Sequence, residues 1–153
     1  MPLHRVRGSR RTILACALGL GLPGGPLGCQ GPGGSPLPDG TNDEPVSFSR
    51  QVEPILTSVC ATCHQQGGAA DLEGIPLRLT ADAAYDMLVG RASVQQSDLL
   101  LVAPGDAEQS YVFQKISRDN PPVGLRMPQF APPLPETQIA LIRDWIDQGA
   151  MDN

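Results

Sequence analysis

The chain has 153 residues, contains few aromatic residues (4%) and carries a formal net charge of −5 at pH 7. This length allows one domain plus extensions, and the acidic balance argues against nucleic acid as a partner, because phosphates select basic surfaces. An acidic surface suits transient docking on a basic patch of another protein, and it also keeps a chain soluble.

Residues 1–28 have the pattern of a secretory signal peptide, which predicts an exported protein. An apolar run from Ile13 to Leu22, too short to span a bilayer, follows a basic region that contains Arg5, Arg7, Arg10 and Arg11. The Arg10-Arg11 pair also resembles a twin-arginine signal, but we interpret it as part of an ordinary basic region.

The leader ends in Pro26-Leu27-Gly28-Cys29, which resembles the lipobox of bacterial lipoproteins. Leu27 and Gly28 fit that pattern, whereas Pro26 stands where an aliphatic residue is usual. We expect Cys29 to be lipidated and to anchor the mature chain to a membrane surface; the alternative is cleavage nearby that leaves Cys29 as a free thiol. Without residues 1–28 the chain has seven Lys or Arg against sixteen Asp or Glu, a net charge of −9.

The next segment, residues 29–46, is rich in Gly, Pro, Ser and Asp and has no apolar period. Such a composition predicts a flexible, disordered tether. It would let a domain formed by residues 47–153 range above the membrane to which Cys29 is attached.

A first helix is predicted from Phe48, because apolar residues then recur at helical spacing: Phe48, Val52, Ile55, Leu56 and Val59. Ser47 or Ser49 could cap this helix. Pro54 lacks a backbone donor, so we expect either a kink or a helix start there.

The helix leads directly into Cys60-Ala61-Thr62-Cys63-His64. Cys-x-x-Cys-His is the pattern for covalent c-type haem attachment. Residues i and i+3 share one face of a helical turn, so Cys60 and Cys63 can form thioethers to two vinyl groups on one porphyrin edge. His64 can then serve as the proximal axial ligand of the iron. The sequence therefore predicts one covalent haem c.

Two other chemistries use closely spaced cysteines. A redox-active thiol pair would be expected in a strand–helix context, but the residues before Cys60 are helical in pattern. A zinc site needs four ligands in tetrahedral geometry, and adjacent Cys63 and His64 are poorly placed to bind one ion together. Haem attachment is the interpretation that the sequence favours.

Short elements follow. Asp71 to Leu79 is expected to be a loop or a short extended piece, and a helix is predicted over Ala81 to Val89, with Thr80 as its cap and Gly90 as its stop. The apolar segment Leu99 to Val102 precedes a third helix, Tyr111 to Ser117.

Asp106 or Ser110 could cap that third helix. Asn120 to Pro135 contains too many prolines for a helix. A last helix runs from Pro135 to Gly149, and the final residues 151–153 should fray. No strands that would form a sheet are apparent, so the predicted class is all-α with about four short helices.

The second axial ligand must be sought among methionines, because His4 lies in the leader and His64 is the only other histidine. Met87 stands in a helical pattern, where a thioether more often fills a core, and Met151 is next to the terminus. Met127 lies in the proline-rich loop, and Pro128 restricts its backbone. A stiff loop suits a weak neutral ligand, so Met127 is the predicted distal ligand.

Taken in order, these motifs resemble a class I cytochrome c, and more narrowly the planctomycete-type cytochrome c domain, over residues 47–150. The resemblance rests on the haem motif and on five further matches: Val52-Glu53-Pro54-Ile55-Leu56, Ala103-Pro104-Gly105-Asp106, Ser110, Arg126-Met127-Pro128 and Trp145-Ile146-Asp147-Gln148-Gly149-Ala150. It implies that the first and last helices cross near one haem edge, with His64 and Met127 on opposite faces of the ring. Glu73 to Gly90 contains no family motif, and Pro135 replaces the more usual Ser or Thr cap.

Six-coordinate iron leaves no position for a substrate, so we expect a one-electron carrier and not an enzyme. Its partners would be other redox proteins that dock transiently, in the periplasm or at the membrane surface. Two alternatives remain: a sensor or subunit of a larger membrane redox complex, and a five-coordinate haem peroxidase if the Met127 loop opens.

Overall fold

The structure, a computed structural model, describes residues 44–153. Helices make up the regular structure of this part of the chain. Within this range there is no sheet, only isolated bridges at Val89–Val102, Ala92–Leu100 and Leu100–Ser110. A small, mostly helical domain agrees with the all-α prediction. The predicted signal peptide, Cys29 and the tether up to residue 43 lie outside the described residues.

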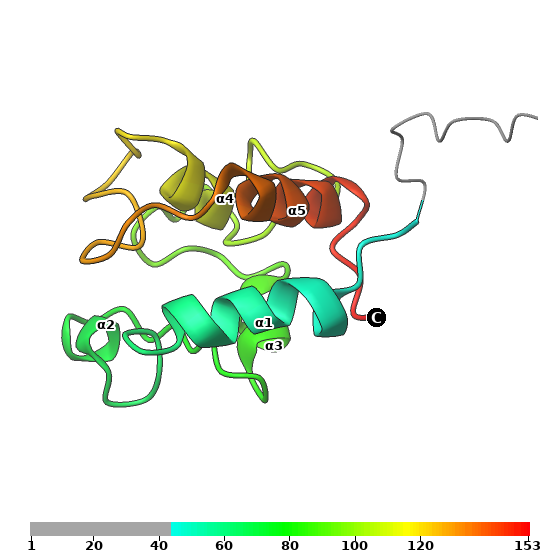
Figure 1. Cartoon of the computed structure of the whole chain (residues 1–153). Helices are drawn as coiled ribbons and strands as arrows, with labels where there is room; N and C mark the ends of the chain where they lie inside the picture. Colours follow the sequence, from blue (N-terminus) through cyan, green and yellow to red (C-terminus); the bar gives the residue numbers. More distant parts are fainter. Residues whose placement is uncertain (1–43) are drawn as a thin grey trace, which may run out of the picture. The chain divides into compact units, whose positions relative to one another are not determined.

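The first helix is continuous from Phe48 to Cys60 and consists of η1 (Phe48–Val52), α1 (Glu53–Ile55) and η2 (Leu56–Cys60) (Figure 1). The Ser47 hydroxyl accepts the Arg50 N–H at 3.4 Å, which confirms Ser47 as a cap. A start at Pro54 is wrong, since the helix passes through this residue. Wider i→i−5 turns, such as that from Glu53 N–H to the Phe48 carbonyl, flank the proline and let the helix pass a residue without an N–H.

A helix was not expected in residues 71–79, but α2 (Ala69–Leu72) extends into this segment. Gly68 is extended and begins it, and the Asp71 carboxylate accepts the Gly67 N–H at 2.8 Å beside the first turn. The buried face of α2 is a single residue, Ala70. The remainder of the segment is irregular, as predicted.

The next helix, α3 (Ala84–Leu88), is shorter than the predicted 81–89. Residues 81–83 form a turn, and the Ala83 and Ala84 N–H groups donate to the Thr80 carbonyl at 3.0 and 2.8 Å. The Thr80 side chain does not cap α3, which begins after Ala83 without a side-chain cap. The predicted stop at Gly90 agrees with its left-handed backbone (φ +69°), a conformation that glycine adopts at low cost. Leu88 is buried in the core.

Two further helices complete the domain: α4 (Tyr111–Ser117) and α5 (Glu136–Asp147). Ser110 precedes α4 but does not cap it, because its hydroxyl instead accepts the Ala103 N–H at 2.8 Å and donates to the Asp106 carbonyl at 2.8 Å. The proline-rich segment between α4 and α5 contains no helix, as predicted. No helix in residues 44–153 has the length and apolar character needed to cross a membrane.

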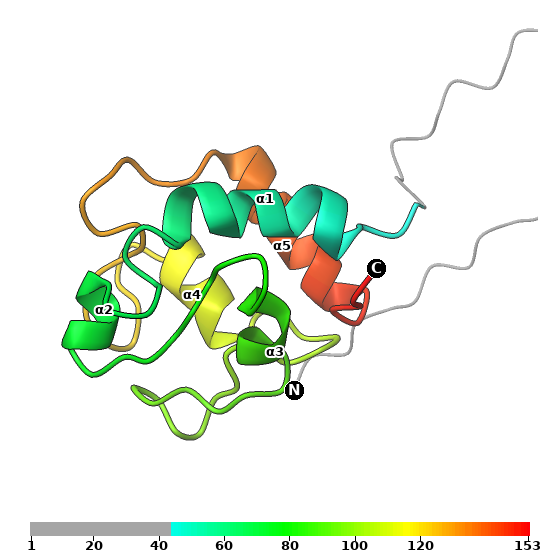
Figure 2. The same cartoon turned by 90° about the horizontal axis from the view of Figure 1, so that it is seen from below.

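The helices form two layers, with the first helix, α2 and α3 in one and α4 and α5 in the other (Figure 1). Seen from below, the first helix crosses α5 (Figure 2), where the Phe48 and Trp145 rings meet. Tyr85 packs edge-on against Phe48, at a centroid distance of 5.2 Å. Other buried side chains of this core are Val52, Leu56, Leu88, Val102, Ile142 and Ile146.

The expected fraying of residues 151–153 is wrong. The C-terminus lies beside the start of η1 in both views (Figures 1 and 2). The Asn153 side-chain oxygen accepts the Phe48 N–H at 2.8 Å, and its main-chain oxygen accepts the Ser49 N–H at 3.0 Å. The Trp145 indole donates to the Met151 carbonyl at 3.0 Å. The bonds from Phe48 and Ser49 satisfy two N–H groups at the start of the first helix that have no partner within the helix.

Candidate haem site

A cavity of about 740 Å³ is lined by residues from both layers. Its walls are mainly apolar and include Val59, Leu77, Leu79, Val112, Leu134 and Ile142. Ligand pockets of about 300–1,000 Å³ with apolar walls and a few polar groups are typical of small-molecule and cofactor sites. The cavity is therefore large enough for a sizeable, mostly apolar ligand.

The two motif cysteines lie on a tight turn at the end of the first helix. The Cys63 and His64 N–H groups both bond to the Cys60 carbonyl, at 3.2 and 2.9 Å. Both cysteines are free thiols and both line the cavity. The structure thus brings the two predicted attachment residues to the same wall.

His64 also lines this cavity, and its Nδ1 is buried without a hydrogen-bond partner among the described residues. Burial, and to a smaller extent the positive charge of Lys115, lowers the pKa of His64. A neutral imidazole with an unpaired nitrogen is the form that binds a metal. The turn is held from behind, since the His64 carbonyl accepts the Leu79 N–H at 2.8 Å and the Cys63 carbonyl accepts the Ala70 N–H at 3.2 Å.

Gly68 is a site residue that sequence reasoning missed. A Cβ atom there would lie 2.5 Å from the Cys63 carbonyl oxygen, closer than real Cβ contacts allow. Its φ of −75° is accessible to any residue, so the requirement for glycine comes from close approach and not from backbone conformation. No local sequence pattern marks such a contact.

The thiol chemistry does not favour a redox-active pair. Burial, with a smaller contribution from Cys63, raises the pKa of Cys60 to about 11, whereas reactive cysteines have lowered values. A structural zinc site needs four donors. Residues 44–153 contain no group of three or more His, Cys, Asp or Glu side chains placed to hold a metal ion.

Met127 lines the cavity from the loop between α4 and α5, in the layer opposite the first helix. Met87 lines it too, from α3, although sequence reasoning gave it a core-filling role. Met151 is 53% exposed and is not part of the cavity wall. The structure therefore brings Cys60, Cys63, His64 and Met127 to one cavity.

Lys115 is a second residue that sequence reasoning missed. It is the only lysine in the chain, and its side chain is buried next to the cavity. It stands within the predicted apolar helix Tyr111 to Ser117, where a lysine is ordinarily assumed to point to solvent. A single lysine on an apolar helix is the signal that could have identified it.

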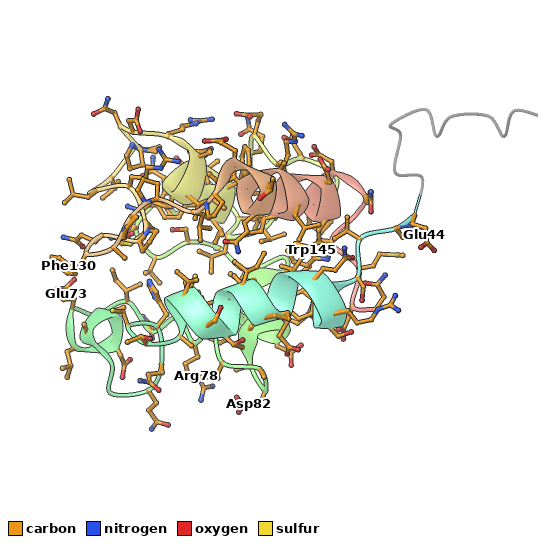
Figure 3. The ribbon with its side chains drawn as sticks, in the orientation of Figure 1. Glu44, Glu73, Arg78, Asp82, Phe130 and Trp145 are labelled. Carbon is orange, nitrogen blue, oxygen red and sulfur yellow. The ribbon has the colours of Figure 1, made fainter. Side chains whose placement is uncertain are left out.

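The mouth of the cavity has an exposed apolar edge. Phe130 is 87% exposed and lines the cavity together with Glu73. Figure 3 places both side chains at the same end of the domain, Phe130 from the proline-rich loop and Glu73 from the end of α2. Trp145 lies away from them, in the core.

The residues present fit a covalently held haem. Two thiols, one unpaired imidazole and two thioethers, those of Met87 and Met127, line a single apolar cavity. They include the donors that c-type haem attachment and His/Met ligation require. Comparison of the chain with protein-family models, with curated proteins and with solved structures found no match. Its function is therefore inferred from its own residues.

Proposed function

We propose that this chain is a monohaem c-type cytochrome that carries single electrons between redox partners. One observation carries the proposal: Cys60, Cys63, His64 and Met127, which lie up to 67 positions apart in the printed sequence, all line the same apolar cavity. Cys60 and Cys63 would hold the haem by thioethers, His64 would be the proximal ligand and Met127 the distal ligand. When bound, the haem supplies an iron that gains and loses one electron, at a potential that His/Met ligation raises.

The chain's own residues supply the environment. The apolar walls would shield the bound group from water, and burial lowers the pKa of His64, which favours the neutral imidazole on the Cys60–His64 turn. We further propose that the helical domain is a class I cytochrome c-like fold, supported by the packing of η1 against α5 and by the absence of a sheet in residues 44–153.

A carrier is favoured over an enzyme by the groups around the cavity. Among the described residues, its wall includes one imidazole, His64, and one carboxylate, Glu73. Peroxide chemistry calls for a distal acid–base group in addition to the metal ligands. With His64 used as a ligand, the other ionisable side chains of the wall are Glu73 at the exposed mouth, Arg91, Tyr111 and Lys115. Tyr111 already donates to Gln95, and Lys115 to two loop carbonyls.

We propose the partners and the location of the protein from its sequence. The mature chain would be exported and anchored by lipid on Cys29, and its net charge of −9 would favour docking on basic patches of other redox proteins. Nucleic acid is not an expected partner.

The test is the oxidised holoprotein's far-red sulfur-to-iron absorption band together with a potentiometric titration. We expect the band in the natural protein, its loss in Met127→Ala, and a single one-electron titration curve. Met87→Ala is the matched control, because Met87 lines the same cavity and should leave the band intact. Rapid turnover of peroxide by the natural protein, or a band that follows Met87 instead of Met127, would contradict the proposal.

A further inference from the structure

The loop that carries Met127 is folded around the ammonium group of Lys115. Lys115 Nζ donates to the Val123 carbonyl at 2.8 Å and to the Leu125 carbonyl at 2.6 Å. Gly124, between these two residues, passes so close that a Cβ atom on it would lie 3.5 Å from Nζ. Lys115 as a whole residue is 7% exposed, so these carbonyls replace water as partners of its ammonium.

The same turn of α4 holds the loop through its backbone. The Met127 N–H donates to the Lys115 carbonyl at 2.7 Å. Arg126 Nε donates to the Ile116 carbonyl at 2.8 Å, and its guanidinium pairs with Asp119 at 2.8 Å. Met127 is therefore attached to α4 by its own amide, and the residues just before it are attached through two cationic side chains.

These bonds are stronger than ordinary loop contacts. Hydrogen bonds from a charged donor are about twice as strong as neutral ones, and a buried cation must keep its partners or leave the interior. The two carbonyl contacts stand in place of water around the Lys115 ammonium. Moving the loop away would leave this group without its two carbonyl partners.

We propose that Lys115 is a positioning residue for Met127: by binding the Val123 and Leu125 carbonyls it fixes the loop so that the thioether stays in the cavity. A neutral thioether binds iron weakly, so its occupancy depends on how little the loop can move. Lys115 acts through the loop and is not itself a ligand in this scheme. The inference rests on the proposed function, because it presupposes that Met127 is the distal ligand.

The experiment uses the oxidised holoprotein and imidazole, which competes with methionine for iron. Lys115→Met keeps the apolar stem and removes the ammonium. We expect a weakened far-red band and imidazole binding on the order of tenfold tighter, the effect of losing hydrogen bonds from one charged group. Arg143→Met is the matched control, because it also removes one positive charge, whereas within residues 44–153 the Arg143 guanidinium pairs with neighbouring Asp144 on α5 and with no other carboxylate.

A double-mutant cycle separates positioning from general destabilisation. In the Met127→Ala background, Lys115→Met should no longer change imidazole affinity, since no thioether is left to position. An equal gain in both backgrounds would overturn the inference. If Lys115→Met holoprotein is not recovered, Lys115→Gln replaces it. A weakened far-red band with tighter imidazole binding in this variant supports the inference. A far-red band and an imidazole affinity equal to those of the natural protein overturn it.

The two proposals fail in different ways. A protein without covalent haem, or with a band insensitive to Met127→Ala, contradicts the proposed function and the inference with it. A band that Met127→Ala abolishes and Lys115→Met leaves unchanged contradicts the inference alone. Slow exchange of the Met127 amide in the natural protein, accelerated in Lys115→Met, would support it independently of the iron.

Discussion

The Phe48 ring packs against the Trp145 ring, with centroids 5.2 Å apart and planes tilted by 36°. This pair joins the first and last helices, and neither residue lines the cavity. The domain therefore has a core of ordinary side-chain packing in addition to the cavity in which a haem is proposed. Substitutions in the packed core and substitutions around the cavity are therefore expected to have different effects.

Phe48→Ala should destabilise the holoprotein by about 3–5 kcal/mol, because it removes a buried aromatic ring and leaves a cavity. Leu72→Ala is the control: it truncates an apolar side chain at a position that is 81% exposed and outside the cavity wall, so its effect should stay within about 0.5 kcal/mol. Chemical denaturation followed by circular dichroism measures both. Equal effects of the two changes would show that Phe48 is not buried in the core.

Asn153→Ala should cost about 1 kcal/mol, because the Phe48 N–H loses its side-chain acceptor at the start of the first helix. Asp152→Ala, at an adjacent exposed position, is the control and should be close to neutral. Thermal unfolding of the holoprotein checks the pair. A frayed terminus would make both variants neutral.

Gly68→Ala should disturb the haem motif, because the new methyl group would overlap the Cys63 carbonyl. We expect a loss of about 1–3 kcal/mol, the usual cost of overpacking, and a lower ratio of attached haem to protein. Gln66→Ala, at an exposed neighbouring position, should keep the natural ratio. An unchanged melting temperature in Gly68→Ala would mean that the turn can relax away from the contact.

A haem-free protein with both Cys60→Ser and Cys63→Ser should lose order mainly around the cavity. Amides bonded near its walls, such as those of Leu79 and Met127, are expected to exchange faster by on the order of tenfold or more. Amides beside the Phe48–Trp145 pair should keep more of their protection. Full native protection at every position would argue that the haem is not part of the core.

The sequence predicted the elements whose pattern repeats. Phe48, Val52 and Leu56 recur at helical spacing because one face of a helix meets the core, and the structure buries all three. The haem motif is equally local, since its chemistry requires two thiols and an imidazole within five residues. Met127 was selected on a different local signal, the density of prolines around it. The structure places it on the cavity wall, and its role as a ligand stays a prediction.

The features that were missed have no periodic signal. A helix as short as α2 buries one small residue, Ala70, and leaves no stripe to detect. The bond from Phe48 to Asn153 spans 105 positions. The contacts of Lys115 depend on the position that the loop with Val123 and Leu125 takes against α4. Such relationships arise only when the chain has folded.

The most direct measurement is an optical spectrum of the mature protein, produced with its export signal in cells that contain haem-attachment machinery. The account predicts a coloured protein whose pyridine haemochrome is of the two-thioether type, with neither Cys60 nor Cys63 open to alkylation. A colourless protein in which both thiols react with an alkylating agent would contradict it.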